Sequence, residues 1–522
     1  MNIQGTTGFS AADPTGGLGE PLYRFPTTIA QQALWYLDRL QPGDPAWNIA
    51  VRFRLRGPLD ASVLEHALNE IVRRHEILRT TFLFEDHSPI QIIHDTCRLE
   101  LPLEDLSRLP SSDRDAEEER RTIAEAACPF NLKTGPLFRA RLLRLAERDH
   151  MLLVTVHHIV SDGWSIGIIS DEIAAHYEAF ASGKRSSAPK LPLQFADYTI
   201  WRNQLSESSE LESHRSYWRT KLADLPLCEI PADYPRPPVK THNGYILSVL
   251  LPAALTDSLT EFSHRHNCTL YITALSTLKL LISRYTQQGD VYVGTLVAGR
   301  DRIEIEPLIG LFVNTLVLRT NLSGNPKFTE LLVRVRQTVE EAIAHQDLHF
   351  QQVVEVLRLK QDFSRPTLYS INFIFQRDFV KPREFAGVGM VPVPSKSPGA
   401  IYDLNFFMVQ RSDGWRLSCE YNYDLYDASS ISRMLGQLRN LFEQIVRNPE
   451  KRISEFSLPE NAGDPLPNFV PQPQTATKTT NVSSMAAPFE RGRSRRASAI
   501  WTKLRSIGQS LRHETNSASG KL

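Results

Sequence analysis

The stretch that decides the fold is residues 151–167, MLLVTVHHIVSDGWSIG. It opens with a run of bulky apolar and β-branched residues, Leu152 to Val156, which predicts a strand buried on both faces. After Asp162 the apolar residues recur with a period near 3.6, which predicts a helix. Ser165 is placed to cap that helix and Gly183 to end it. Side chains and backbone N–H groups converge where a strand gives way to a helix, so the polar residues between the two form a candidate site.

Two adjacent histidines, His157 and His158, close the predicted strand. Side chains alternate across a strand, so we expect the two rings to point to opposite sides of the sheet. This argues against a metal site that uses both, and no HExxH or CxxC pattern lies nearby to complete one. A lone histidine on a core strand is most simply a buried imidazole that bonds to the backbone. The pair favours one structural histidine and one that acts as a base or a hydrogen-bond partner.

The residues Gly163, Ser165 and Gly167 also spell G-x-S-x-G between a strand and a helix, which is the context of a serine hydrolase's nucleophile elbow. Two residues separate the strand from the first glycine, however, and no HGGG-like segment precedes it. A helix cap explains Ser165 more simply. A serine hydrolase or thioesterase that uses Ser165 stays open as an alternative.

The rest of the chain predicts two domains. Residues 1–22 are Gly-rich and polar, which indicates a disordered tail. Strand-like and amphipathic helical segments then alternate, as in an α+β sheet domain covered by helices. The Ser/Pro/Lys-rich connector at residues 182–192 is the best candidate boundary. We therefore expect two related sandwich-like lobes, over residues 23–186 and 187–460, although no strict sequence repeat is present.

Bulk composition narrows the function classes. A chain of 522 residues exceeds what one hydrophobic core usually supports. Lys+Arg and Asp+Glu both number 59, which gives no support for a nucleic-acid partner. The five cysteines are odd in number and widely spaced, which predicts reduced thiols and no zinc or disulfide framework. No signal peptide and no membrane span is evident, so we expect a soluble cytoplasmic protein.

The last segment, residues 461–522, differs in composition from the rest. It begins as a linker rich in Pro, Thr, Asn and Ser. A basic run follows, with Ile500, Leu504, Ile507 and Leu511 at helical spacing. Such a helix on a flexible tether could dock on a partner protein or lie on an anionic membrane. An inert tail is the equal alternative, because short isolated helices are marginally stable.

Several motifs together resemble one family. HHIVSDGWS resembles the HHxxxDG motif of the condensation domains of nonribosomal peptide synthetases. TIAQQALWYL is similar to their first motif, RRHEILRTTF to the second, YVGTLVAGR to the fourth, IGLFVNTLVLR to the fifth, HQDLHFQQVV to the sixth and DFSRPTLYSINFIF to the seventh. The motifs occur in the family's order from about Tyr23 to Pro459, which makes the match far more specific than any single pattern.

The resemblance implies an architecture and a reaction. It implies two chloramphenicol-acetyltransferase-like α/β sandwich lobes that form a V-shaped pseudo-dimer with a central tunnel. A donor carrier protein would present an acyl thioester, and an amine or hydroxyl acceptor would enter from the other side on a second carrier or as a free small molecule. The product would be an amide or an ester in nonribosomal peptide or hybrid polyketide biosynthesis. No metal and no bound cofactor are implied, because the partner carrier protein supplies the phosphopantetheine arm.

The resemblance also assigns roles to residues. His158 would face the tunnel, as a base or as an orienting group, while His157 would be structural. Asp162 would be structural and would pair with a distant arginine, for which Arg300 is the first choice and Arg79 the second.

The backbone N–H of Gly163 is a reasonable oxyanion donor, because glycine allows close approach. An epimerising relative and a noncatalytic carrier-recruiting platform on the same fold are alternatives. DGWS in place of DGVSW favours condensation over epimerisation, and the retained His158 argues against a platform.

Overall fold

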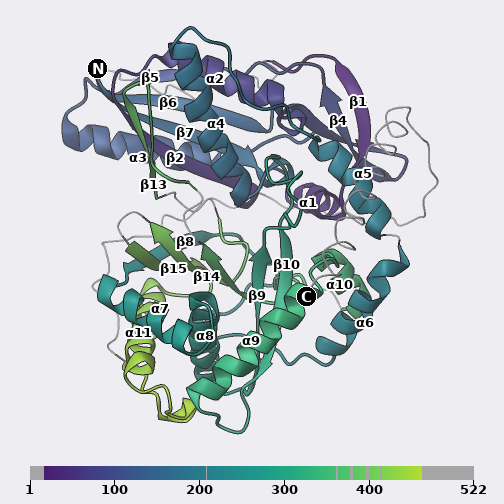
Figure 1. Ribbon diagram of the computed structural model, residues 1–522, viewed down its shortest axis with the longest axis vertical. Helices are drawn as coiled ribbons and strands as arrows, with labels where there is room; N and C mark the ends of the chain where they lie inside the picture. Colours follow the sequence, from purple (N-terminus) through teal and green to yellow (C-terminus); the bar gives the residue numbers. More distant parts are fainter. Residues whose placement is uncertain are drawn as a thin grey trace, which may run out of the picture.

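The computed structural model describes residues 17–206, 208–359, 362–376, 380–394, 399–411 and 414–460. Two lobes, each a sheet with helices, lie one above the other in Figure 1. This mixture of sheets and helices confirms the predicted α+β class. The first strand begins at Pro21, slightly earlier than expected. The linker and basic segment at residues 461–522 and most of the predicted N-terminal tail lie outside the described residues.

The N-terminal lobe is built on a six-stranded sheet with the order β12-β13-β2-β7-β6-β5 and on a three-stranded sheet with the order β1-β4-β3. The strands are β1 (Pro21–Pro26), β2 (Asn48–Arg56), β3 (Thr80–Glu85), β4 (Ser88–His94), β5 (Leu103–Asp105), β6 (Phe138–Ala146), β7 (Asp149–His157), β12 (Arg383–Phe385) and β13 (Val388–Val393). The helices are α1 (Ile29–Leu40), α2 (Ala61–Arg74), α3 (Ser111–Ala127), α4 (Gly163–Ala181) and α5 (Phe195–Ser206), with short 3-10 turns η1 (Pro45–Trp47), η2 (Glu76–Arg79) and η3 (His158–Val160).

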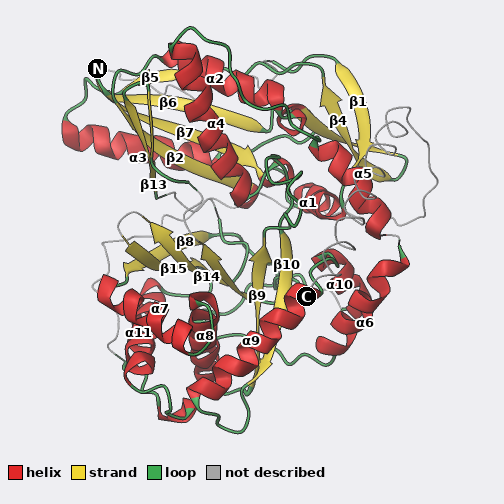
Figure 2. Cartoon of the chain, viewed as in Figure 1, coloured by secondary structure: helices red, strands yellow, loops and turns green. Residues whose placement is uncertain are grey.

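The C-terminal lobe is built on a six-stranded sheet with the order β10-β9-β11-β14-β15-β8. The strands are β8 (Gly244–Leu250), β9 (Asp290–Val297), β10 (Asn314–Asn321), β11 (Ile371–Gln376), β14 (Leu404–Arg411) and β15 (Gly414–Asn422). The helices are α6 (Glu212–Lys221), α7 (Ala253–Arg265), α8 (Leu270–Thr286), α9 (Phe328–Ala344), α10 (Phe350–Leu357) and α11 (Ala428–Arg447), with turns η4 (Ser209–Leu211) and η5 (Ile453–Glu455). Figure 2 shows α7, α8 and α11 on the side of this sheet away from the N-terminal lobe.

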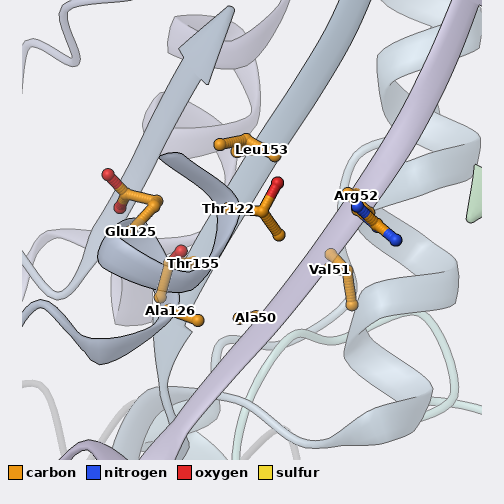
Figure 3. Close-up of a pocket in the computed structure, with 8 residues that line it drawn as sticks. All are labelled: Ala50, Val51, Arg52, Thr122, Glu125, Ala126, Leu153 and Thr155. Carbon is orange, nitrogen blue, oxygen red and sulfur yellow. The ribbon is translucent and has the colours of Figure 1, made fainter. Parts of the chain in front are cut away.

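The central strand β7 is buried on both faces, as its apolar run predicts. Residues 151–156 are all buried. Helices α2 and α4 contribute to the hydrophobic cluster on one face, and α3 covers the other. A small cavity lies on the α3 side of β2 and β7 (Figure 3); it is lined by Ala50, Val51, Arg52, Thr122, Glu125, Ala126, Leu153 and Thr155. The polar end of β7 is therefore the part of this strand that is left to form a site.

The helix after β7 forms where its period predicts, but its cap differs. Asp162 is the cap of α4, and its side chain accepts a hydrogen bond from the N–H of Ser165. The prediction that Ser165 caps the helix is therefore wrong, because Asp162 is itself a strong cap former and stands earlier in the chain. Gly183 ends the helix with φ of +67°, a left-handed conformation that glycine adopts at little cost.

The two lobes are not contiguous in the sequence. Strand β13 pairs antiparallel with β2, so residues 383–393 return from the second half of the chain to the N-terminal sheet. Residues 305–312 also contribute apolar side chains to the N-terminal hydrophobic cluster. The predicted boundary at 186/187 therefore separates the lobes less cleanly than expected, because short returning segments have too little periodicity to be assigned from sequence.

The two large sheets share a topology. β2 is antiparallel to β7, β7 is antiparallel to β6, and β6 is parallel to β5. β8, β15, β14 and β11 follow one another with the same relations. Helix α4 follows β7 as α11 follows β15. The expectation of two related lobes is thus met at the level of topology.

Candidate active site

His157 ends β7 and is enclosed. Its exposed fraction is 3%, and its Nδ1 atom accepts a hydrogen bond of 3.1 Å from the N–H of Ile159. The neutral ring therefore carries its proton on Nε2. Burial, with a smaller effect from neighbouring positive charge, lowers the pKa of His157 to about 3. This imidazole stays neutral and holds the turn that follows it.

His158 opens η3 and is only partly buried. Its Nδ1 atom lies 3.1 Å from the carbonyl oxygen of Ser161. A carbonyl can only accept, so the proton sits on Nδ1 and the lone pair on Nε2. Burial lowers the pKa of His158, against the opposing charge of Asp162. Strand β7 ends at His157, so His158 already belongs to the turn. The turn, more than the alternation of side chains along a strand, gives the two neighbouring rings opposite tautomers and different exposure.

Asp162 lies at the centre of a buried hydrogen-bond network, with an exposed fraction of 2%. Oδ1 accepts from the N–H and the hydroxyl of Ser165, at 2.9 and 2.8 Å. Oδ2 accepts from Nη1 of Arg300 at 2.7 Å and from the N–H of Phe312 at 3.1 Å. These donors satisfy an ionised carboxylate that would otherwise be costly to bury.

Arg300 reaches Asp162 from the other lobe. It follows β9, and its side chain is fully buried, with the guanidinium 4.2 Å from the centre of the Phe312 ring. Arg79, the second candidate partner, lies elsewhere: its Nε donates to the carbonyl of His94, and its Nη1 donates to that of Arg73 near the end of α2. The aspartate of the motif is thus tied to the C-terminal half of the chain by a buried ion pair.

Ser165 belongs to this network as well. Its hydroxyl donates to Asp162, accepts from the N–H of Gly310 at 3.1 Å and lies 3.1 Å from Nη2 of Arg300. The residue is fully buried. A nucleophile must be reachable and must bond to a base, so the geometry disfavours a serine hydrolase.

Gly163 offers a backbone donor beside open space. It is the first residue of α4 and is exposed. The first N–H groups of a helix have no acceptor within the helix. A Cβ built on Gly163 would meet no atom within 4 Å. A carbonyl oxygen could therefore approach this N–H.

One residue that holds the site was missed from the sequence. Gln31 in α1 is fully buried, and its Nε2 atom donates to the carbonyl oxygen of Ile159 within η3 at 3.2 Å. Its Oε1 atom accepts from the N–H of Thr28, which makes Thr28 and Gln31 a capping box. That T-x-x-Q spacing is readable in a sequence and predicts a helix start. It carries no signal for the contact with the histidine turn.

The described ranges hold neither a metal-ligand cluster nor a membrane span. Within them, no group of three His, Cys, Asp or Glu side chains is placed to hold a metal ion. Over the same part of the chain, no helix combines the length and apolar character needed to cross a bilayer. All five cysteines are free thiols.

The two lobes, whose sheets share the same strand relations, have the chloramphenicol-acetyltransferase-like fold that the solved structures share. Within that class, the profile of the family described as "Condensation domain" matches residues 24–464, and the chain belongs to this family. The predicted family and fold are thus confirmed.

Relatives with curated descriptions are large synthases. The chain is 41% identical over 438 residues to one of the linear gramicidin synthase proteins of Brevibacillus parabrevis, a match that covers 83% of this chain and 6% of the relative. It is 34% identical over 450 residues to surfactin synthase subunit 1 of Bacillus subtilis (strain 168), a match that covers 86% of this chain and 12% of the relative. The chain therefore spans only a small fraction of the length of these relatives.

Solved structures share the fold. The X-domain from teicoplanin biosynthesis is 29% identical with a TM-score of 0.75, covering 84% of this chain and 98% of that one. An X-domain of the same biosynthesis has been solved in complex with OxyB. The first condensation domain of the calcium-dependent antibiotic synthetase, 20% identical with a TM-score of 0.71, covers 84% of this chain and 100% of that one and shows the shared fold alone.

Proposed function

We propose that this chain is a condensation enzyme. It transfers an acyl group from the phosphopantetheine thioester of a carrier protein to an amine, or to a hydroxyl, and forms an amide or an ester in nonribosomal peptide or hybrid polyketide biosynthesis. The observation that carries the proposal is the His158 ring, which is partly open and has Nδ1 occupied by the Ser161 carbonyl. Membership of the condensation-domain family supports the proposal.

His158 is proposed as the base. Its Nε2 atom takes a proton from the acceptor nitrogen as that nitrogen attacks the thioester carbonyl carbon. The new C–N bond forms, the C–S bond breaks, and the proton passes to the departing sulfur. The lowered pKa of His158 keeps the ring neutral at physiological pH and so able to accept this proton.

Charge that develops on the carbonyl oxygen needs a donor. The N–H of Gly163, at the positive end of the α4 dipole, is proposed for this role. The Asp162–Arg300 pair fixes the start of α4 and therefore the direction of this N–H. The substrates are proposed to meet in a tunnel between the lobes, with the donor carrier protein at one mouth and the acceptor at the other, in the cytoplasm.

The proposal is tested with a loaded carrier protein, encoded beside this chain, and a panel of amines and alcohols. Intact mass of the products identifies the bond formed. We expect product with the full chain, strong loss with His158→Ala and retention of most activity with Ser165→Ala. Loss with Ser165→Ala alone would contradict the proposal and would support a hydrolase.

The basic segment after Pro488 is proposed to dock the partner that delivers the donor. Its positive charges and apolar stripe suit an acidic, partly apolar protein surface. Deleting the residues after Pro488 should slow transfer from the natural carrier and spare transfer from a small-molecule thioester. Equal losses with both donors would contradict docking.

A recruiting platform is the second candidate function, favoured by the similarity to the teicoplanin X-domain that was solved in complex with OxyB. A platform would bind a loaded carrier and form no product with any nucleophile. Binding that survives His158→Ala, together with no turnover by the full chain, would favour it over the enzyme.

A further inference from the structure

A second polar contact joins the lobes away from the Asp162–Arg300 pair. Oδ2 of Asp44, in the loop between α1 and η1, bonds to Nδ1 of His242, in the segment before β8. Nζ of Lys240 lies 3.1 Å from Nε2 of the same ring. A carboxylate only accepts and an ammonium only donates, so His242 is neutral with its proton on Nδ1. The order is anion, neutral ring, cation, and each hydrogen bond has a charged partner.

The N-terminal anchor of this contact leads directly to the histidine turn. Oδ1 of Asp44 caps η1 through the N–H of Ala46 at 2.9 Å. η1 runs into β2, whose first residue, Asn48, pairs with His157. Asp44 is therefore coupled through a short stretch of regular backbone to the strand end that precedes His158.

The C-terminal anchor is equally well held. The side-chain amide of Asn422 donates to the carbonyl of Thr241 at 2.8 Å, and the N–H of Ala400 donates to that of His242 at 2.8 Å. Lys240 also donates to the carbonyl of Ile401. Residues 240–242 are thus fixed to the end of β15 and to the segment before β14.

The two anchors also pack closely. A Cβ built on Gly399 would lie 2.8 Å from the carbonyl oxygen of His242 and 3.0 Å from Cβ of Ala46. Ala46 itself is buried. The lobes approach so closely here that a side chain at position 399 would push them apart.

We propose that Asp44, His242 and Lys240 form an interlobe brace that sets the separation of the two lobes beside the His158 turn. The Asp162–Arg300 pair ties the residues after the His158 turn to the C-terminal half of the chain. The brace ties β2 to the C-terminal lobe, and β2 pairs with β7, the strand that precedes the turn. The three residues of the brace are positioning residues, since they act through η1 and β2. The brace sets the geometry of the lobes and does not depend on the proposed chemistry.

The test uses His242→Phe, which keeps a ring of similar size and removes both hydrogen bonds. Amide hydrogen exchange of the full chain is followed by mass spectrometry over residues 43–50 and 240–246. Loss of a charge-assisted hydrogen bond should raise exchange about tenfold in both windows, one in each lobe. His264→Phe, at an exposed histidine of α7, is the matched control and should change neither window.

A second variant separates a brace from local loosening. Asp44→Asn retains an oxygen that caps η1 but turns an amide N–H toward the ring, and it should accelerate the same two windows. The double variant should exchange no faster than either single variant, because one contact is lost in each. Acceleration confined to residues 240–246 in His242→Phe, or additive effects in the double variant, would overturn the proposal even if the condensation activity is intact.

Discussion

The turn after β7 and the turn after β15 stand at matching places in the two lobes, yet the candidate site lies at the first. β7 ends at His157 and Asp162 caps the next helix; β15 ends at Asn422 and Asp427, the same number of residues on, caps the next helix. Each strand end pairs with the first residue of its neighbouring strand. Both halves of the chain therefore contain the same local order of a strand, a turn and a helix that is capped by an aspartate.

The surroundings of the two aspartates differ. Asp162 is buried and bonds to Arg300 from the other lobe. Asp427 is exposed and accepts from the Tyr234 hydroxyl and the N–H of Ser429. Local sequence supplies a cap in either place, whereas a site needs a partner that arrives through tertiary structure.

The largest effect should come from the residue that follows each strand end, which is His158 in one lobe and Tyr423 in the other. His158→Ala should lower kcat/KM by about 10²–10⁴-fold, the usual contribution of a general base. Tyr423→Phe should leave kcat/KM unchanged. Product formation from a loaded carrier measures both, and a similar loss in the two variants would mean that His158 has only a packing role.

The next effect should be on stability at the two caps. Asp162→Ala leaves the Arg300 guanidinium buried without its partner, which should cost about 3–5 kcal/mol. Asp427→Ala removes only a cap and should cost about 1 kcal/mol. Denaturant unfolding measures the difference. Adding Arg300→Met to Asp162→Ala should recover part of the loss, and equal costs at the two caps would contradict the buried-pair account.

A smaller effect on stability should follow from a change of pH. His157, which ends β7, can take up a proton, whereas Asn422, which ends β15, cannot. The pKa of His157 is about 3 in the fold, below its ordinary value of 6.5. The unfolded chain therefore binds the proton first, so stability falls as pH drops below 6.5 and continues to fall down to about pH 3. Between pH 7 and pH 5 the loss from this group is about 2 kcal/mol.

His157→Phe should remove that part of the pH dependence. Unfolding midpoints of the variant and of the parent chain at both pH values give the comparison. An unchanged slope in the variant would show that other groups carry the acid sensitivity.

The smallest effect should be at the serines that stand three residues after each cap, Ser165 and Ser430. Ser165→Ala loses the hydrogen bonds to Asp162, Gly310 and Arg300, and Ser430→Ala loses those to Asp233 and Arg433. Each should cost about 1 kcal/mol and leave turnover within about tenfold of the parent. Unfolding and product formation are measured on the same samples. Abolished turnover in Ser165→Ala alone would contradict the assigned roles.

Sequence reasoning reached the parts of this fold that repeat with a regular period or form long motifs. The strand over residues 151–157 and the helix after Asp162 have clear hydrophobic patterns. Gly183 ends the helix because its position has a positive φ, which glycine adopts readily. Ser165 and Asp162 are both cap formers, so local preference could not rank them.

Contacts between segments that are far apart in the chain could not be predicted from the local pattern of the sequence. Arg300 and Arg79 have the same chemistry, and only the three-dimensional path of the chain puts Arg300 against Asp162. The same holds for Gln31, whose helix start was predictable while its bond to Ile159 depends on how α1 packs on η3. Strands β12 and β13 are too short, and too far along the chain from β2, for their pairing to be predicted.

The return of β13 to the N-terminal sheet has a consequence for cutting and recombining such chains. A fragment that stops at residue 186 would contain β2 but not β13, so β2 would become an open sheet edge with free N–H and C=O groups. It would also lose Phe385, Val388 and Met390 from its hydrophobic cluster. Such a fragment should aggregate, because its open sheet edge would pair with that of another copy. When segments are exchanged between related synthases, the cut points should therefore lie outside the two lobes, so that both lobes are moved together.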